Sequence, residues 1–183
     1  MSEENVEVRR QPDRDRLDQL QARLPGLTGM LLAGVLRTPP GSEIRKRMVK
    51  WAVQRGFAAM NRSDVDLVVT FYEPDAVVWM HGMGGVGIRE RYGGHEGIRE
   101  LYADSDDAWG DWAYQVREVV DLADHVAVRA DFLGHGRSSG AETTLNDVGT
   151  LVTFSDRGKI ARQEWFVESG GWRQALEAAG LRE

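Results

Sequence analysis

Histidine is the side chain that most readily moves a proton near neutral pH, and this sequence contains four of them. His81, His95, His125 and His135 lack the spacing of a metal site, such as two histidines four residues apart on one helix. His125 and His135 fall in expected turns, and His95 begins an expected helix. His81 ends an expected strand beside a glycine-rich loop, so it is our candidate for a general acid or base. The alternative for His81 is a structural hydrogen bond to the backbone.

Asp131 is the second candidate for proton transfer. It lies in an expected strand from Val126 to Leu133, where alternation places it on the same face as Arg129. A buried Asp131 could act as a base, whereas an exposed one would form a cross-strand ion pair. The sequence leaves both possibilities open.

The strand expected from Thr143 to Phe154 carries polar residues on an otherwise apolar face. Its even positions are Asn146, Val148, Thr150, Val152 and Phe154. Because successive strand residues point to opposite faces, this pattern predicts that Asn146 and Thr150 point inward. A buried polar group without a partner costs about 1–3 kcal/mol. Asn146 and Thr150 therefore each need a hydrogen-bond partner in the protein, a water molecule or a ligand. If the chain is an enzyme, we expect Asn146 and Thr150, together with Tyr72, to hold an oxygen atom of the substrate.

Six tryptophans are more than the core of a 183-residue chain requires, and large aromatic side chains suit the walls of a binding cavity. The expected walls of this cavity are Val78, Trp79, Met80, Tyr102, Trp109 and Trp165. Residues 77–81 allow two strand registers, because a slip by one residue exchanges Met80 for Trp79 or His81 on the inner face.

Gly82 to Gly87 has the G-x-G-x-x-G spacing of a dinucleotide-binding motif. That motif requires a helix to begin at the third glycine, so that the helix N-terminus meets a pyrophosphate. Only Ile88 to Tyr92 separate the third glycine from Gly93 and Gly94, which is too short for such a helix. We expect the segment 82–94 to be a mobile loop at the rim of the pocket, and we expect no cofactor.

The composition excludes several classes of protein. With 23 basic and 29 acidic residues the net charge is −6, whereas a nucleic acid or an anionic membrane requires a basic partner surface. The chain has no cysteine and therefore no disulfides, thiolate metal ligands or cysteine nucleophile. The acidic N-terminus does not resemble a secretion signal, and the apolar stretch 24–36 is too short to span a membrane. We expect a cytoplasmic protein with no metal site.

The chain divides into two zones. In residues 1–42, leucines at steps of three and four predict a helical arm, which ends at Pro39-Pro40-Gly41. Residues 43–183 place helices before strands, a pattern typical of an α+β domain. Helices are expected at about 43–60, 65–72, 95–109 and 172–179, and strands at 75–81, 112–121, 126–137, 143–154 and 160–168. We expect a cone-shaped, curved antiparallel sheet packed against three helices, with a cavity between them.

Several segments, in this order, resemble the SnoaL-like polyketide-cyclase families of the nuclear transport factor 2-like superfamily. They are Phe57 to Asp64, Tyr72 to Asp75, Tyr92 to Glu100, Phe154 to Ile160 and Ala175 to Leu181. The resemblance covers about residues 43–181. It implies a cone-shaped α+β barrel with a deep apolar pocket, which dimerises through the outer face of its sheet. The N-terminal arm is an addition to the minimal family.

Relatives in this superfamily include cyclases, ketosteroid isomerases, dehydratases and epoxide hydrolases as well as non-catalytic binders, so fold alone does not define activity. Set against the ketosteroid isomerase pattern, Gly56 replaces a tyrosine donor, Met80 replaces the aspartate base and Thr150 replaces a protonated aspartate. Tyr72 matches a supporting tyrosine. The resemblance therefore does not imply ketosteroid isomerase chemistry.

Three hypotheses follow. The first is a cofactor-independent cyclase, isomerase or dehydratase that acts on a hydrophobic, oxygenated molecule, with His81 or Asp131 moving the proton. The second is a protein that binds such a molecule without chemistry. The third is a dimeric interaction partner with a vestigial cavity. As partners we expect a small hydrophobic molecule and a second copy of the chain, bound through the outer sheet face, but no nucleic acid and no membrane span.

Overall fold

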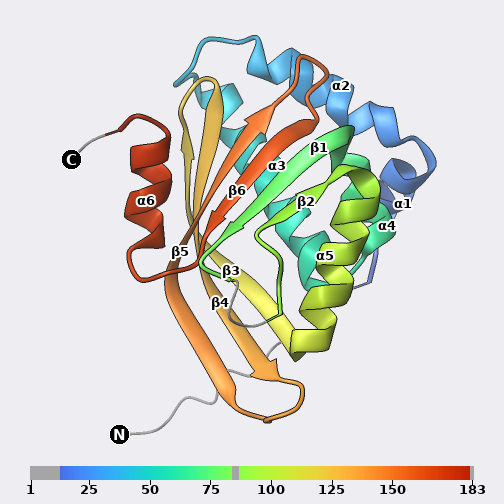
Figure 1. Cartoon of the computed structure of the whole chain (residues 1–183). Helices are drawn as coiled ribbons and strands as arrows, with labels where there is room; N and C mark the ends of the chain where they lie inside the picture. The colour runs from blue at the N-terminus through green and yellow to red at the C-terminus, as the bar shows by residue number, and fades with distance from the viewer. Residues whose placement is uncertain (1–12, 84–86, 182–183) are drawn as a thin grey trace, which may run out of the picture.

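The computed structural model describes residues 13–83 and 87–181 (Figure 1). The helices are α1 (Arg16–Arg23), α2 (Pro25–Leu36), α3 (Glu43–Asn61), α4 (Val65–Val68), α5 (Gly94–Ala108) and α6 (Gly171–Ala178), and a 3-10 turn, η1, spans Val69–Phe71. The strands are β1 (Tyr72–His81), β2 (Arg91–Gly93), β3 (Trp109–Asp121), β4 (His125–Gly136), β5 (Glu142–Phe154) and β6 (Ile160–Phe166). This order confirms the predicted α+β class.

The strands form one curved sheet in the order β2-β1-β6-β5-β4-β3. The described strand pairs are antiparallel except for β1 and β6, which run parallel. Helices α3, α4 and α5 lie on the inner side of the sheet, and α6 packs on the opposite face against β4, β5 and β6 (Figure 1). The expected arrangement of three helices against a curved sheet is confirmed, and α6 covers part of the outer face.

Local sequence explains how α3 begins. The Ser42 side chain accepts a hydrogen bond from the Arg45 amide, as expected for an N-cap. Burial in the first turn does not follow residue type, because Ile44 is 70% exposed while its neighbour Arg45 is 2% exposed. Arg45 is buried because its guanidinium pairs with both carboxylate oxygens of Asp121, at 2.7 and 2.9 Å.

The connection from β1 to α5 differs in part from the expected loop. Within the segment 82–94, residues 84–86 lie outside the described residues. Arg91–Gly93 forms the short strand β2, which pairs with β1 through Val77, Val78 and Trp79. A three-residue strand with one buried side chain has too little alternation to be recognised from sequence.

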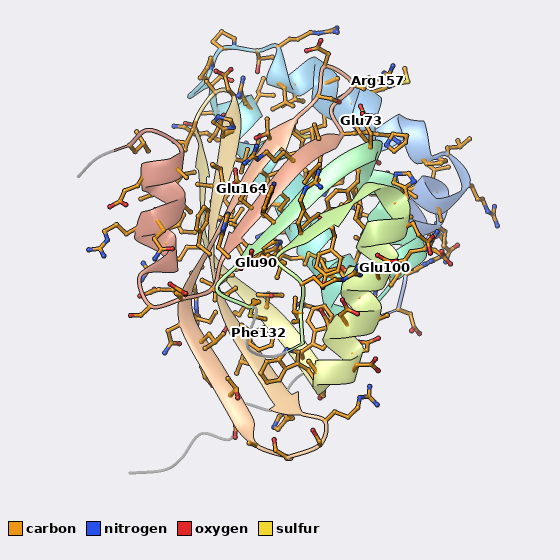
Figure 2. The ribbon with its side chains drawn as sticks, in the orientation of Figure 1. Glu73, Glu90, Glu100, Phe132, Arg157 and Glu164 are labelled. Atoms are coloured by element: carbon orange, nitrogen blue, oxygen red, sulfur yellow. The ribbon has the colours of Figure 1, made fainter. Side chains whose placement is uncertain are left out.

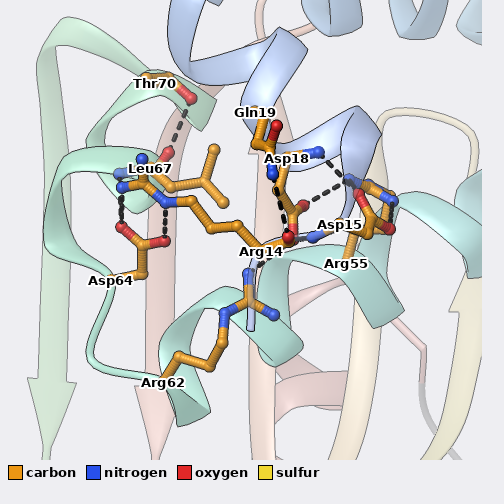
Figure 3. A network of polar contacts seen from close by, with 9 residues as sticks. All are labelled: Arg14, Asp15, Asp18, Gln19, Arg55, Arg62, Asp64, Leu67 and Thr70. Carbon is orange, nitrogen blue, oxygen red and sulfur yellow. Dashed lines mark hydrogen bonds and ion pairs between the residues drawn. The ribbon is translucent and has the colours of Figure 1, made fainter. Parts of the chain in front are cut away.

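The arm packs across one end of the barrel, where α1 contacts α4 and α2 contacts α3 and η1 (Figure 1). Ion pairs hold α1 in place: Asp18 accepts hydrogen bonds from Arg55 and Arg62, and Arg14 pairs with Asp64 (Figure 3). The division into an arm of residues 1–42 and a domain of residues 43–183 stays a prediction. In the described part of the chain, no helix is long and apolar enough to cross a membrane.

Candidate functional site

One cavity of the barrel interior is walled by aromatic rings, and we call it the aromatic cavity. It has a volume of about 30 Å³ and lies between α5 and strands β1, β3, β4 and β6. Its lining comprises Met60, Met80, Met83, Ile88, Leu101, Tyr102, Ser105, Trp109, Trp112, Tyr114, Phe132 and Trp165. Phe132 marks its position at the lower end of the barrel in Figure 2.

Strand alternation brings these rings together. Trp112 and Tyr114 are both buried, two positions apart on β3, and Phe132 pairs with Tyr114 on β4. The Tyr114 ring lies 4.7 Å from that of Trp165 and 5.2 Å from that of Phe132, centroid to centroid. Such tilted contacts give a rigid apolar wall.

Two polar atoms in this wall have no hydrogen-bond partner among the described residues: the Tyr102 hydroxyl and the Trp109 indole nitrogen. Tyr102 is 4% exposed and Trp109 is 9% exposed. The neighbouring Trp112 indole, by contrast, donates to Asp106 at 3.1 Å. Burial raises the pKa of Tyr102 well above its ordinary value, so its hydroxyl keeps its proton at neutral pH. Two residues of the lining therefore carry unused hydrogen-bond donors.

The described lining of the aromatic cavity contains no aspartate, glutamate or histidine. Its polar side chains are hydroxyl and indole groups, which donate hydrogen bonds but do not exchange protons near pH 7. These groups can bind and polarise an oxygen atom. The described lining residues offer no carboxylate or imidazole that could transfer a proton.

A second cavity, of about 80 Å³, lies at the other end of the barrel interior beneath α1 and α2, and we call it the arm-roofed cavity. Its lining comprises Gln21, Thr28, Gly29, Leu32, Ala52, Val53, Arg55, Gly56, Phe57, Met60, Val68, Thr70, Phe71, Tyr72, Val128, Val152, Phe154, Gly158, Lys159, Ile160 and Gln163. Met60 lines both cavities and stands between them.

A chain of buried polar groups lies beside the arm-roofed cavity. The Tyr72 hydroxyl donates to Gln163 Oε1, and Gln163 Nε2 donates to Thr150 Oγ1 at 3.2 Å. All three residues are at most 5% exposed, and burial raises the pKa of Tyr72. The predicted inward orientation of Thr150 is confirmed, since Thr150 is 0% exposed, whereas its expected role with Tyr72 in holding a ligand oxygen stays a prediction. Because they satisfy each other through Gln163, their polar groups have partners within the protein.

The structure places both candidate proton-transfer residues on the outer face of the sheet. His81 Nε2 lies 3.2 Å from Glu164 Oε2, and its ring stacks on Phe166 at 4.8 Å. Asp131 accepts a hydrogen bond from Arg117 Nε at 2.7 Å, the cross-strand pair considered above. Neither His81 nor Asp131 lines a cavity of the barrel interior.

The register question for residues 77–81 has a clear answer. Val78 and Met80 are buried in the interior core, whereas Trp79 is half-buried beside His81, with Arg91 over its ring. The expectation that Trp79 lines the pocket is therefore wrong. The β1 sequence is apolar on both faces at this point, so alternation alone did not decide which face is inner.

Asn146 is also wrongly placed by the expected alternation, because it is exposed. Asp147 has a φ of 62°, and the pairing of β4 with β5 shifts register between Ala130 and Phe132. This β-bulge lets Leu145 and Val148 both face the core, so residues before the bulge have the opposite orientation from that expected.

Four of the predicted wall residues meet in the aromatic cavity, namely Met80, Tyr102, Trp109 and Trp165. Val78 is buried in the same core without lining either cavity. Sequence reasoning missed Trp112, Tyr114 and Phe132, although the alternate spacing of Trp112 and Tyr114 in one strand was a usable signal. It also missed Gln21, for which the sequence offers no signal.

Comparison with known proteins supports the assignment of the fold. The sequence profile of the SnoaL-like domain matches residues 53–163. No curated protein matches the chain. TerC, crystallised with polyporic acid, is 25% identical over 70% of this chain and 97% of its own, with a TM-score of 0.58.

Two further solved structures share the fold. A protein from Catenulispora acidiphila with a ketosteroid isomerase-like fold, in complex with trimethylamine, is 18% identical over 71% of this chain and 92% of its own, with a TM-score of 0.56. SalBIII, an epoxide hydrolase/cyclase-like enzyme of pyran ring formation in salinomycin, is 17% identical over 67% of this chain and 92% of its own, with a TM-score of 0.56. Because the domain profile spans more than half of the 183 residues, this chain belongs to the SnoaL-like family.

Proposed function

We propose that this protein binds a hydrophobic, carbonyl-bearing small molecule in the aromatic cavity and orders it for a cyclase-type reaction without a cofactor. The observation that carries the proposal is the pair of buried, unpartnered donors, Tyr102 and Trp109. Leaving a buried donor unpaired costs about 1–3 kcal/mol, so an acceptor supplied by a ligand relieves that cost twice.

A carbonyl oxygen fits these donors because it offers two lone pairs. Hydrogen bonds inside an apolar cavity are stronger than in water, and they strengthen further as negative charge develops on the oxygen. Tyr102 and Trp109 would thus polarise the carbonyl and stabilise an enolate-like or alkoxide-like transition state.

The remainder of the ligand is apolar and ring-shaped, because rings such as Trp112, Tyr114 and Phe132 form the walls. The cavity of about 30 Å³ is smaller than such a ligand, so side chains must move to admit it. Met60, Met80 and Met83 are suited to this because unbranched methionine side chains change conformation easily.

Two structural neighbours support a function on small molecules by what their names state, and one of them, SalBIII, supports a cyclase-type reaction. TerC was crystallised with polyporic acid, and SalBIII is described as an epoxide hydrolase/cyclase-like enzyme. Family membership itself supports a cyclase-type fold for small molecules.

A second candidate function is binding without chemistry. It is favoured by the same lining, in which the described residues include no carboxylate or imidazole to accept a proton.

The same lining limits how a cyclase-type reaction can proceed. Such a reaction relies on the folded conformation of the bound substrate and on polarisation of its carbonyl, and any proton released passes to water.

The test is a ligand panel of aromatic polyketides, steroids, terpenoids and fatty acids, each with and without a carbonyl, measured by thermal shift and calorimetry. A saturating ligand at about one hundred times its Kd stabilises the protein by about 2.7 kcal/mol. Tyr102→Phe and Trp109→Phe should each weaken carbonyl compounds about tenfold, which corresponds to about 1.4 kcal/mol. Retention of full affinity in both variants would refute the proposal.

Tyr92→Phe is the matched control, because it also removes a buried tyrosine hydroxyl. That hydroxyl donates to Asp104 at 2.7 Å and lines neither cavity. Its removal should lower stability without changing ligand affinity. Product analysis after long incubation then separates the two functions: a ring-closed product supports the cyclase, and unchanged compound supports the binder.

We also infer that two copies of the chain associate through the outer sheet face. Trp79 and His81 lie there beside each other with their rings parallel within 4°, and both remain half-buried rather than covered. Aromatic residues of this kind are enriched in protein interfaces. Trp79→Glu should convert a dimer to a monomer in a solution mass measurement, and an unchanged mass would contradict this interface.

A further inference from the structure

Gln21 is a lining residue of the arm-roofed cavity and carries an unpaired hydrogen-bond acceptor. Its Nε2 donates to Thr70 Oγ1 at 3.0 Å, and Thr70 in turn donates its single hydroxyl proton to the Leu67 carbonyl at 2.6 Å. Thr70 therefore has no proton left for Gln21, which fixes the orientation of the Gln21 amide. Its Oε1 has no partner among the described residues, although Gln21 is only 4% exposed.

No described residue donates a hydrogen bond to this amide oxygen. The surrounding walls are mainly apolar, with Leu32 above, Val53 and Phe57 on α3, and Val152 on the sheet. An unpaired acceptor in such surroundings is costly, because it has lost its water without gaining a partner.

The roof of this cavity is firmly seated on the barrel. The backbone of α2 at Gly29 lies against the turn at Gly158, where a Cβ on Gly158 would collide with the Gly29 carbonyl oxygen. A Cβ on Gly29 would lie 2.9 Å from the Arg157 carbonyl oxygen. Side chains at these positions would lift the roof, so the two glycines allow the arm and barrel to enclose one cavity.

We propose that the arm-roofed cavity is a second ligand site, which takes a compact hydrophobic alcohol or phenol whose hydroxyl donates to Gln21 Oε1. The volume of about 80 Å³ suits a single ring or a short aliphatic chain rather than a polycyclic molecule. The site depends on Gln21 and Leu32, which precede the family-matched residues 53–163, so it is a property of this chain's arm.

The proposed site is independent of the proposed function of the aromatic cavity. That cavity contains free donors, Tyr102 and Trp109, and selects an acceptor. The arm-roofed cavity contains a free acceptor, Gln21, and selects a donor. A phenol hydroxyl can donate to Gln21 and can also accept from Tyr102 or Trp109, so variants of both cavities are needed beside the probes to tell which one binds.

The experiment titrates the full chain with para-fluorophenol and with para-fluorotoluene, which has the same shape but no donor, and follows fluorine NMR. We expect para-fluorophenol to bind at least about tenfold more tightly, and Gln21→Met to remove that preference. Leu32→Phe, which fills the cavity and leaves Gln21 intact, should abolish binding of both probes. Tyr102→Phe is the matched control and should change neither affinity.

Nuclear Overhauser contacts in the wild-type protein locate the probe without any variant. Contacts from para-fluorophenol to the methyl groups of Leu32 and Val152 would support the site. Contacts to Met80 alone, equal affinity of the two probes, or a phenol preference that survives Gln21→Met would each overturn it. Absence of binding would also overturn it, because a water molecule would then be the donor to Gln21.

Discussion

The aromatic cavity and the arm-roofed cavity lie in the same barrel interior but have opposite polarity. Unpaired donors, Tyr102 and Trp109, line the first, whereas an unpaired acceptor, Gln21, lines the second. The donors come from the segment that matches the SnoaL-like family, and the acceptor comes from α1, which precedes that segment. The proposed second site therefore combines residues that precede the family-matched segment with barrel residues that lie within it.

The two cavities also differ in what holds their walls. Packed rings enclose the aromatic cavity, whereas the arm that covers the other cavity is fixed by charged groups. Asp18, 4% exposed, joins Arg55 and Arg62, and Arg14 joins Asp64 (Figure 3). Changes to ion pairs should therefore affect the arm-roofed cavity first.

The largest effect is expected for Arg45→Met. Besides its pair with Asp121, Arg45 donates to the carbonyls of Leu36, at 2.6 Å, and Thr38, at 3.1 Å, and so ties the end of the arm to the barrel. Its loss leaves the Asp121 carboxylate, 5% exposed, without a positively charged partner, since only the Ala123 amide then donates to it. We expect the free energy of unfolding to fall by about 3–5 kcal/mol, measured by urea titration.

The control for this prediction is Arg45→Met combined with Asp121→Leu, which removes both charges. We expect it to recover most of the lost stability, because no buried charge is then left unpaired. Native-state hydrogen exchange should show greater loss of protection in α2 than in α5 for the single variant. Equal loss in the two helices would contradict the separate anchoring of the cavities.

Met60→Ala should have the next largest effect, because Met60 lines both cavities. Removing this half-buried side chain should cost roughly 2–3 kcal/mol and should join the cavities into one. A ligand that carries a carbonyl at one end and a hydroxyl at the other should then bind more tightly than to the wild type, as measured by calorimetry. Met60→Leu keeps the partition and should show no such gain.

Most of the fold was predictable because hydrophobic periodicity is long and regular in α3, α5 and β3 to β6. Prediction failed where a tertiary contact replaced the local pattern. Arg45 is buried by a partner, Asp121, that lies 76 residues away. The parallel pairing of β1 with β6 and the position of α6 on the outer face likewise depend on chain topology rather than on local sequence.

The candidate site was predictable where residue type alone defined its role. Trp109, Trp165, Tyr102 and Met80 are large, and they meet in one cavity. The face of the sheet to which a side chain points was harder to predict. The bulge at Asp147 turns Asn146 outward, and β1 is apolar on both faces at Trp79, so its pattern does not show which face is inner. The unpaired state of Tyr102, Trp109 and Gln21 follows from three-dimensional surroundings, which no sequence pattern reports.

A comparison of Thr150→Val with Asn146→Ala tests the orientations of β5. Thr150 is 0% exposed and accepts from Gln163, so its replacement leaves a buried amide donor unpaired at a cost of at least about 1 kcal/mol. Asn146 is exposed, so Asn146→Ala should change the free energy of unfolding by less than about 0.5 kcal/mol. The reverse order in urea titrations would mean that the bulge at Asp147 is absent.

The smallest expected effect is the response of the arm to acid. The hydrogen bond from Arg55 lowers the pKa of Asp15 from 3.8 to about 2, and that from Arg14 lowers the pKa of Asp64. A carboxylate whose pKa is lower in the folded protein stabilises the fold above its unfolded pKa, and this contribution is lost as the pH falls. The arm should therefore lose stabilisation between about pH 4 and pH 2.

Asp15→Asn measures this contribution directly. The variant should melt at a slightly lower temperature than the wild type at pH 6, and the two melting temperatures should converge as the pH falls towards 2, because Asp15 is then protonated. Tyr102→Phe is the control from the other cavity: its hydroxyl stays protonated throughout this range, so its difference from the wild type should not depend on pH. A constant difference for Asp15→Asn would mean that Arg55 does not hold the arm through this carboxylate. The contrast between a cavity closed by ion pairs and one closed by aromatic rings would then rest on Asp18 and on the pair between Arg14 and Asp64.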